Sequence, residues 1–359
     1  MRHLLPCLFV ARTFAATCTA VMILGGGAWA RPLIIPFVMS SPEYGIGFGV
    51  KARDRGLFGG PGFGDLTGMY TTRGQWYVEL SGLRDSIAGN CRLGGTVEGG
   101  VFPELYSGEG SPAPKASLAG YTPTYALASM FAGYWFQGGI RMDLGLAIDH
   151  REIERSDTGA MAGWARRTRG YPDGGTQVRV SVEGEWNRLD HPADPHSGTT
   201  LVARFEPPVP GSAWALGFIQ GTLIETPFAA GPTMVLRARH EAAGGDVPFW
   251  KIPSAGKSRL LRGLSDYRVR GRSLQALGSE LRQPLAILGF ATEAVAFGEA
   301  ARAGDEGGVW SSDPVFGFGC GGRLLLDDRH AVLRVDLGWN TSSEATVAPA
   351  LYVDFGQAF

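Results

Sequence analysis

Apolar and polar side chains alternate along much of the chain, in segments of about ten residues, the length of a membrane-crossing strand. From Ile140 to Asp149 every second residue is apolar, and the residues between them are charged or small. The same alternation recurs at residues 178–187, 316–321 and 333–339. Because successive side chains of a strand point to opposite faces, this spacing predicts strands with one apolar and one polar face. Helical spacing fits none of these windows.

Across the whole chain, the pattern predicts strands at residues 32–40, 45–53, 65–72, 75–84, 91–102, 124–136, 139–152, 176–188, 199–206, 213–226, 233–241, 273–283, 288–300, 315–326, 331–340 and 347–359. The segment 65–72 is the most ambiguous of these because it is largely polar. An even number of long antiparallel strands is typical of bacterial outer-membrane proteins. The predicted fold class is therefore all-β, a transmembrane antiparallel β-barrel of about sixteen strands. A soluble protein of two sheets is the alternative, since its strands would also alternate.

The predicted connections alternate in length, as they do between the two ends of such barrels. Residues 137–138 and 327–330 form tight turns, which we assign to the periplasmic end. The segments 103–123, 153–175 and 242–272 are long and are assigned to the outer end.

The N-terminus has the layout of a secretory signal peptide. Arg2 and Arg12 precede an apolar run from Phe14 to Leu24, and small residues follow at Ala28 and Ala30. We expect residues 1–30 to be a signal for Sec-type export, cleaved after Ala30, and residues 31–359 to be one barrel. No later segment approaches the roughly 20 apolar residues of a spanning helix. The expected location is the outer membrane of a Gram-negative-type bacterium.

Charge and cysteine content exclude several functions. Lys and Arg number 33 against 34 Asp and Glu, which gives no global basic surface for binding nucleic acid. The 54 glycines and 11 per cent aromatic residues suit many strands with tight turns and interfacial side chains. Cys91 and Cys320 match no metal spacing, and the sequence does not settle whether they are paired. We expect no metal and no cofactor.

The sequence predicts no enzyme. It contains no Gly-x-Ser-x-Gly elbow, and its six histidines show no His-Glu-x-x-His spacing. A membrane protease or phospholipase with catalytic residues at the outer rim is the alternative. Its best candidates are Asp149, His150 and Glu152, near the outer end of a predicted strand. A solvated rim explains these three residues equally well.

The longest connection carries a more specific motif. Arg262-Gly263-Leu264 is followed by Arg270-Gly271-Arg272, and the next strand contains Glu280. The chain here resembles the BamA/TamA family of outer-membrane assembly barrels, also called bacterial surface antigens, most clearly over residues 176–359. In that family the sixth outer loop carries an Arg-Gly-aromatic motif and folds back into the lumen.

The resemblance implies that Arg262 pairs with acidic side chains of the inner wall, at Glu280 and Glu299. A guanidinium can engage a carboxylate through two parallel hydrogen bonds and so fix a loop in a partly solvated lumen. Strand parity places Glu280 inward if Leu277 and Leu281 face lipid. The sequence departs from the family pattern at Leu264, where an aromatic residue is usual, at Glu299 in place of aspartate, and at Ala301 in place of glycine. A solvated arginine-rich loop is the alternative for this motif.

The last strand ends in Leu351, Val353, Phe355 and Phe359 on one face. A terminal aromatic residue resembles the signal read by the barrel-assembly machinery, which we expect to insert this chain. Outer-membrane lipid and lipopolysaccharide are the other expected surroundings.

Strand-like sequence begins directly after Ala30, so we expect no periplasmic POTRA domain before the barrel. Two functions therefore remain open. The chain assists insertion or transport of outer-membrane proteins together with a separate periplasmic partner, or it is a passive channel or structural surface protein. The sequence does not reveal the client, the oligomeric state, whether the lumen is open, or whether the seam between the first and last strands opens.

Overall fold

The structure is a computed structural model. It describes residues 33–41, 45–54, 62–87, 89–106, 119–155, 173–191, 194–228, 231–256, 260–264, 269–287, 290–304, 312–327, 331–341 and 350–355.

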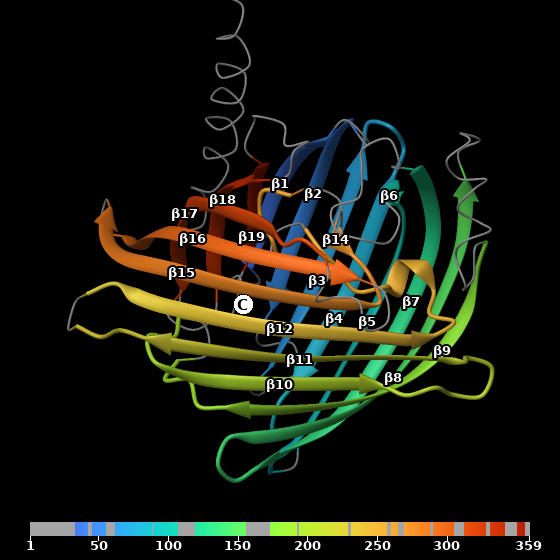
Figure 1. The fold of residues 1–359 in the computed structure, drawn as a ribbon, viewed down its shortest axis with the longest axis horizontal. Helices are drawn as coiled ribbons and strands as arrows, with labels where there is room; N and C mark the ends of the chain where they lie inside the picture. The colour runs from blue at the N-terminus through green and yellow to red at the C-terminus, as the bar shows by residue number, and fades with distance from the viewer. Residues whose placement is uncertain are drawn as a thin grey trace, which may run out of the picture.

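Within the described residues, sixteen antiparallel strands make up the barrel wall (Figure 1). They are β1 (Leu33–Ser41), β2 (Gly45–Asp54), β3 (Gly62–Thr71), β4 (Trp76–Arg84), β5 (Cys91–Val101), β7 (Ala119–Phe136), β8 (Ile140–Arg155), β9 (Gly174–Asn187), β10 (Gly198–Glu206), β11 (Trp214–Glu225), β12 (Thr233–Gly245), β15 (Ser273–Ile287), β16 (Phe290–Gly304), β17 (Val315–Asp327), β18 (Ala331–Asn340) and β19 (Ala350–Phe355). The short strand β6 (Glu104–Tyr106) adds to this sheet beside β7. The predicted fold class is confirmed.

Each wall strand pairs with the next one along the chain, in an unbroken ladder from β1 to β19. Strands β10 to β12 and β15 cross the front of Figure 1, and β2 to β5 lie behind them. The ladder contacts of β1 and β19 within the described residues are those to β2 and β18. Strand β1 begins, and β19 ends, at the same end of the barrel as the tight turn at residues 137–139.

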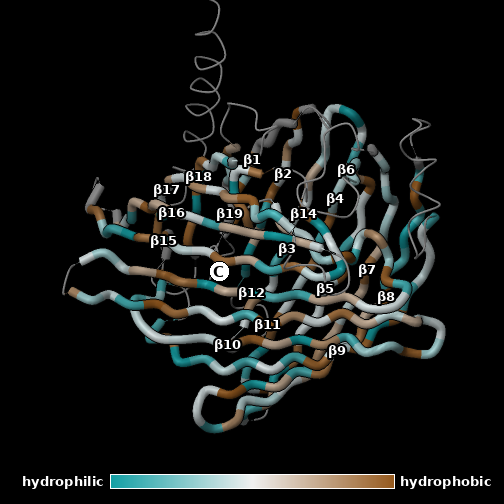
Figure 2. The backbone as a smooth tube through the Cα atoms, in the orientation of Figure 1, coloured by the Kyte–Doolittle hydropathy of each residue, from teal (hydrophilic) through white to brown (hydrophobic). Residues whose placement is uncertain are grey.

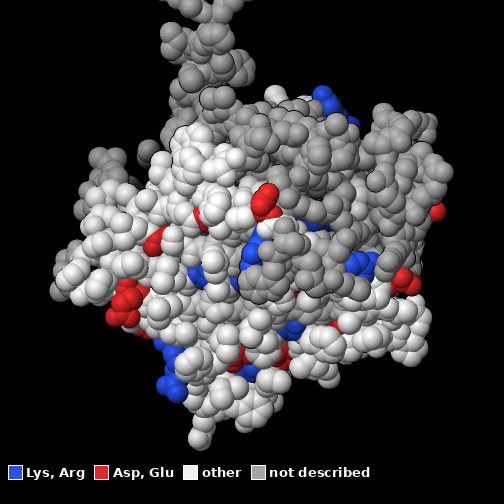
Figure 3. Space-filling model, viewed as in Figure 1, with Lys and Arg blue, Asp and Glu red and all other residues white. Residues whose placement is uncertain are grey.

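The alternation in the sequence separates the two faces of the wall. On β8, the outward side chains of Ile140, Leu144 and Ile148 are exposed, whereas the inward Asp143 and Asp149 are buried. Figure 2 shows the resulting mixture of apolar and polar positions along each strand. Figure 3 shows charged side chains only in small, scattered groups on the viewed face. An apolar exterior around a charged interior is the pattern that a barrel adopts in a lipid bilayer.

The structure corrects two of the predicted connections. The segment 103–123, predicted as a loop, contains β6 and the beginning of β7, which starts at Ala119. The segment 242–272 contains the 3-10 turn η3 (Phe249–Lys251) and a hairpin of β13 (Ser254–Ala255) and β14 (Val269–Arg270). The ambiguous segment 65–72 lies in β3, which ends one residue earlier.

No helix in the described part of the chain is long and apolar enough to cross a membrane. Cys91 and Cys320 are both free and exposed, so they form no disulfide with each other.

Candidate functional site

The connection between β12 and β15 folds back into the lumen and packs on the inner wall. Leu261, Leu264 and Val269 are each almost completely buried. They form one apolar cluster with inward side chains of β15, β16 and β17, namely Leu274, Ala276, Ala301, Ala303 and Val315. This segment, residues 246–272, is called the lumen loop below.

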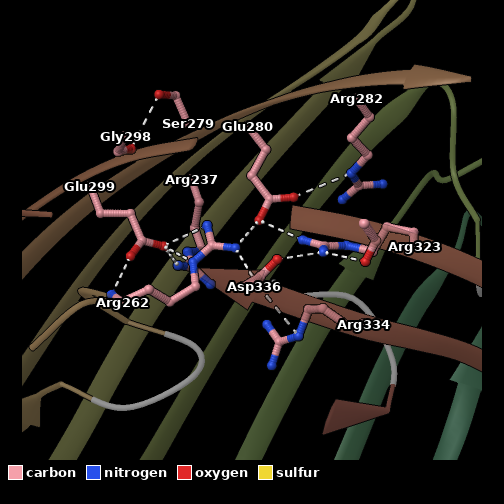
Figure 4. Close-up of polar contacts among 11 residues, drawn as sticks. Arg237, Arg262, Ser279, Glu280, Arg282, Gly298, Glu299, Arg323, Arg334 and Asp336 are labelled. Carbon is pink, nitrogen blue, oxygen red and sulfur yellow. Dashed lines mark hydrogen bonds and ion pairs between the residues drawn. The ribbon is translucent and has the colours of Figure 1, made fainter. Parts of the chain in front are cut away.

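Arg262 is the centre of the polar contacts in the lumen (Figure 4). Its Nη1 lies 2.8 Å from Glu280 Oε1, and its Nη2 lies 2.9 Å from Glu299 Oε1. The backbone N–H of Arg262 donates to Glu299 Oε2 at 2.5 Å. Asp336 Oδ2 accepts a third side-chain contact from Nη1 at 2.8 Å. The guanidinium also lies 3.5 Å from the ring centroid of Phe297.

Strand parity and register bring these partners together. Glu280, Glu299 and Asp336 lie on the inner faces of β15, β16 and β18 and are all buried. Gly278 lies between Arg237 and Glu299 in one row across three strands. Because the glycine has no side chain, Arg237 reaches across it to within 3.5 Å of Glu299.

Further arginines surround the three carboxylates. Arg323 donates to Asp336 Oδ1 at 2.6 Å and approaches Glu280 at 3.5 Å. Arg282 donates to Glu280 Oε2 at 3.3 Å, and Arg334 lies 3.9 Å from Asp336. Each carboxylate therefore contacts Arg262 and at least one arginine of the wall. The loop is bound into a charge network that spans five strands.

Burial and the carboxylates act in opposite directions on Arg262. Burial lowers the pKa of its guanidinium, but Glu280, Glu299 and Asp336 together raise that pKa above its ordinary value. Arg262 is thus held charged. Removing one partner from a buried pair costs about 3–5 kcal/mol because the other charge is left uncompensated. The loop should therefore be difficult to detach at this point.

Glycines of the wall let the loop backbone approach closely. A Cβ on Gly317 would lie 2.5 Å from the carbonyl oxygen of Arg262, and one on Gly338 would lie 2.6 Å from the nitrogen of Gly263. Gly263 itself has a φ of 92° and lies against the backbone of Trp339. The inward glycines that alternate with Phe316, Phe318 and Trp339 thus form the seat of the motif.

The contacts described for Arg270, Gly271 and Arg272 are with residues outside the Arg262 network. Arg270 is buried beside the ring of Tyr106, at 5.1 Å from the centroid, and donates to the carbonyl of Phe249 at 3.4 Å. Gly271 packs against the backbone of Gly304. Arg272 donates to the carbonyl of Gly245 at 2.7 Å. These residues instead hold the two ends of the loop together.

A second anchor of the lumen loop is apolar. Phe249 of η3 is completely buried and makes edge-to-face contacts with Tyr106 and Tyr121. Trp214, Ala243, Val247 and Ile252 complete this cluster. It is separate from the cluster around Leu261 and Leu264.

The three enzyme candidates of the outer rim lie on two different faces of the wall. Asp149 points inward, where Arg151 lies at 3.2 Å and Lys251 of η3 at 3.5 Å. His150 points outward, where its Nδ1 lies 2.8 Å from the hydroxyl of Thr176. Glu152 lies beside His150 and is exposed. Asp149 therefore lies on the opposite face of the wall from His150 and Glu152.

The remaining predicted residues lie at the chain ends. The backbone of Val353 and Phe355 pairs with β18. Phe359, and the cleavage-site residues Ala28 and Ala30, lie outside the described residues. In the described part of the chain, no group of His, Cys, Asp or Glu could hold a metal ion.

Sequence reasoning missed Asp336 and Phe297 as partners of Arg262. A signal for Asp336 was present, since the alternation from Leu333 to Trp339 places it on the inner face. The sequence does not show how deeply the loop reaches into the lumen. That depth decides which carboxylates Arg262 contacts.

No family model and no curated protein matches the sequence. Solved structures do match. BamA from Haemophilus ducreyi lacking POTRA domains 1–3 aligns with a TM-score of 0.63 at 14% identity, over 90% of this chain and 69% of that one. CdiB from Escherichia coli aligns with a TM-score of 0.61 at 12% identity, over 92% of this chain. The chain spans 62% of the length of CdiB. The fold is therefore that of BamA-like barrels, as the resemblance in the sequence predicted.

Proposed function

We propose that this chain is an outer-membrane barrel that assists the insertion or transport of other outer-membrane proteins, together with a separate periplasmic partner. The observation that carries the proposal is the insertion of Arg262 between Glu280 and Glu299 within a BamA-like barrel. The role is non-enzymatic.

We propose the outer membrane, reached by Sec-type export, as its location. The exposed apolar side chains of β8 and the aromatic Tyr134, Phe136 and Trp186 near one barrel end support this location. Heat-dependent gel mobility of the protein from fractionated outer membranes tests it. A chain lacking Phe359 should lose the heat-shifted band if the terminal residue is read by the barrel-assembly machinery.

Reconstituted liposomes test the proposed activity. The purified barrel should accelerate folding of a small outer-membrane barrel protein presented in urea, scored by the heat-shifted gel band. The Arg262→Ala variant should lower this acceleration to the level of empty liposomes, because the loop leaves its seat. Arg302→Ala is the matched control, since Arg302 lies on the outer face and contacts Gln275. Equal acceleration by the wild-type and Arg262→Ala proteins would contradict the proposal.

The alternative is a passive channel or structural surface protein. Steady ion conductance of the wild-type barrel, without any effect on client folding, would favour this alternative. The buried lumen loop counts against it.

A further inference from the structure

The backbone of the loop motif is held from two neighbouring strands at once. From β18, the side-chain amide of Asn340 donates to the carbonyl of Gly263 at 2.6 Å. From β19, Tyr352 contributes its hydroxyl, which accepts a hydrogen bond from the N–H of Gly263 at 3.1 Å. The same hydroxyl donates to the carbonyl of Leu264 at 3.4 Å. Tyr352 thus joins the lumen loop to the last strand.

The loop cannot slide relative to the wall at this point. The positive φ of Gly263 and the close approach of Trp339 and Gly338 leave no space for a shifted register. The ion pairs of Arg262 fix the loop one residue earlier. The hydrogen bond that the N–H of Gly263 donates to the hydroxyl of Tyr352 therefore ties β19 to a fixed point.

Within the described residues, the ladder contacts of β19 are those to β18. It is described over six residues and pairs with β18 from Leu333 to Gly338. The two hydrogen bonds between Tyr352 and the loop add to this pairing.

We propose that Tyr352 is a positioning residue that couples docking of the lumen loop to retention of β19 on β18, so that each stabilises the other. Such coupling is reciprocal, because a contact that exists only when both elements are in place strengthens each by the same factor. Loss of the loop loosens β19, and loss of β19 loosens the loop. The inference concerns the barrel itself and does not depend on the proposed function.

Hydrogen exchange on the intact protein in detergent micelles tests the coupling. Tyr352→Phe keeps the ring and removes the hydroxyl, and it should speed exchange in residues 350–355 by about tenfold, as expected for loss of one or two hydrogen bonds. Arg262→Ala should speed exchange in the same segment, although the ion pairs of Arg262 within the described residues are with β15, β16 and β18. Tyr134→Phe is the matched control because Tyr134 is exposed on the outer face of β7. It should leave exchange in β19 unchanged.

The double variant gives the decisive result. If the hydroxyl carries the coupling, Arg262→Ala with Tyr352→Phe exchanges in residues 350–355 no faster than Arg262→Ala alone. Fully additive effects, or normal exchange in β19 of either single variant, would overturn the proposal. If Arg262→Ala does not yield a heat-shifted barrel, Asn340→Ala replaces it in the cycle, since it loosens Gly263 from β18 and leaves Tyr352 intact.

Discussion

Gly263 has no room for a side chain. Its φ of 92° lies in the region that disfavours residues with a Cβ, and that Cβ would lie 2.4 Å from the backbone oxygen of Trp339. Gly263→Ala should therefore displace the motif from its seat and expose the loop to protease. The measurement is the rate of cleavage within residues 257–268 of the folded barrel.

Gly221→Ala is the control for this change. A Cβ at Gly221 meets nothing within 4 Å, and the residue lies in the middle of β11. Its cleavage rate should match that of the wild type. Equal protection of the loop in both variants would contradict the close packing at Gly263.

Lys251 predicts a pH dependence of loop docking. Burial, and then repulsion from Arg179 and Arg151, lowers the pKa of Lys251 to about 8 against the opposing effect of Asp149. The ordinary value is 10.5, which we assign to the undocked loop. At a pH between these two values, Lys251 is protonated in the undocked loop and neutral in the docked loop. Docking should therefore strengthen as the pH rises through this window, by about tenfold per pH unit, and stay constant below it.

Fluorescence of the neighbouring Trp250, or protease protection of residues 246–256, measures this effect from pH 7 to 9.5. Lys251→Met should abolish the dependence, because methionine has a similar length and no charge. If Lys251→Met keeps the wild-type pH profile, another titratable group causes the pH dependence of docking.

The alternation of inward and outward positions along each strand was the most reliable signal in the sequence for locating the site residues. It placed Glu280 inward from Leu277 and Leu281, and the structure has it 2.8 Å from Arg262. The position of Arg270 and Arg272 away from Arg262 could not be foreseen in this way. It depends on the β13–β14 hairpin, whose two-residue strands are too short for any periodic signal.

At the scale of elements, the turn η3 should anchor the loop independently of Arg262. Phe249 is fully buried, and replacing a buried phenylalanine by alanine typically costs about 3–5 kcal/mol. Phe249→Ala should speed hydrogen exchange in residues 246–256 and leave residues 261–264 protected. The reason is that the two apolar clusters share no residue.

Phe228→Ala controls for the loss of an aromatic ring. Phe228 is 70% exposed in the connection between β11 and β12, so its removal should leave the loop unchanged. Parallel loss of protection at residues 261–264 in Phe249→Ala would show that the loop undocks as one unit.

The long strands were predictable because each presents many alternations, and a shift by one residue would turn every side chain to the wrong face. Strand β6 was missed because three residues carry too little pattern. The beginning of β7, from Ala119 to Pro123, was missed because the proline interrupts the strand pattern there. That proline lies within β7 opposite Ile153 of β8.

At the scale of the whole molecule, the number of wall strands and their meander order followed from the sequence. Their order follows because antiparallel strands joined by short turns must be neighbours. The arrangement of side chains in the lumen could not be predicted from the sequence, because it depends on contacts between residues far apart in the chain. Arg262 and Asp336, for example, are 74 positions apart.

The state of the lumen gives the last prediction. With Arg262 bound to the wall and Phe249 of η3 packed against Tyr106 and Tyr121, the wild-type barrel should show no steady conductance in planar bilayers. Replacing residues 248–270 by a short Gly-Ser linker should open it to ions. Selectivity of this pore should be weak, because arginines and carboxylates are interleaved on the inner wall, as at Arg237, Glu280 and Glu299.

The double variant Arg262→Ala with Phe249→Ala separates loop release from loop removal. If the loop seals the lumen only while it is anchored, this variant should open intermittently, and each single variant should remain mostly closed on the remaining anchor. A wild-type barrel that conducts as steadily as the linker variant would mean that the loop occupies the lumen without sealing it. The anchors would then serve to hold the wall and β19 rather than to close a pore.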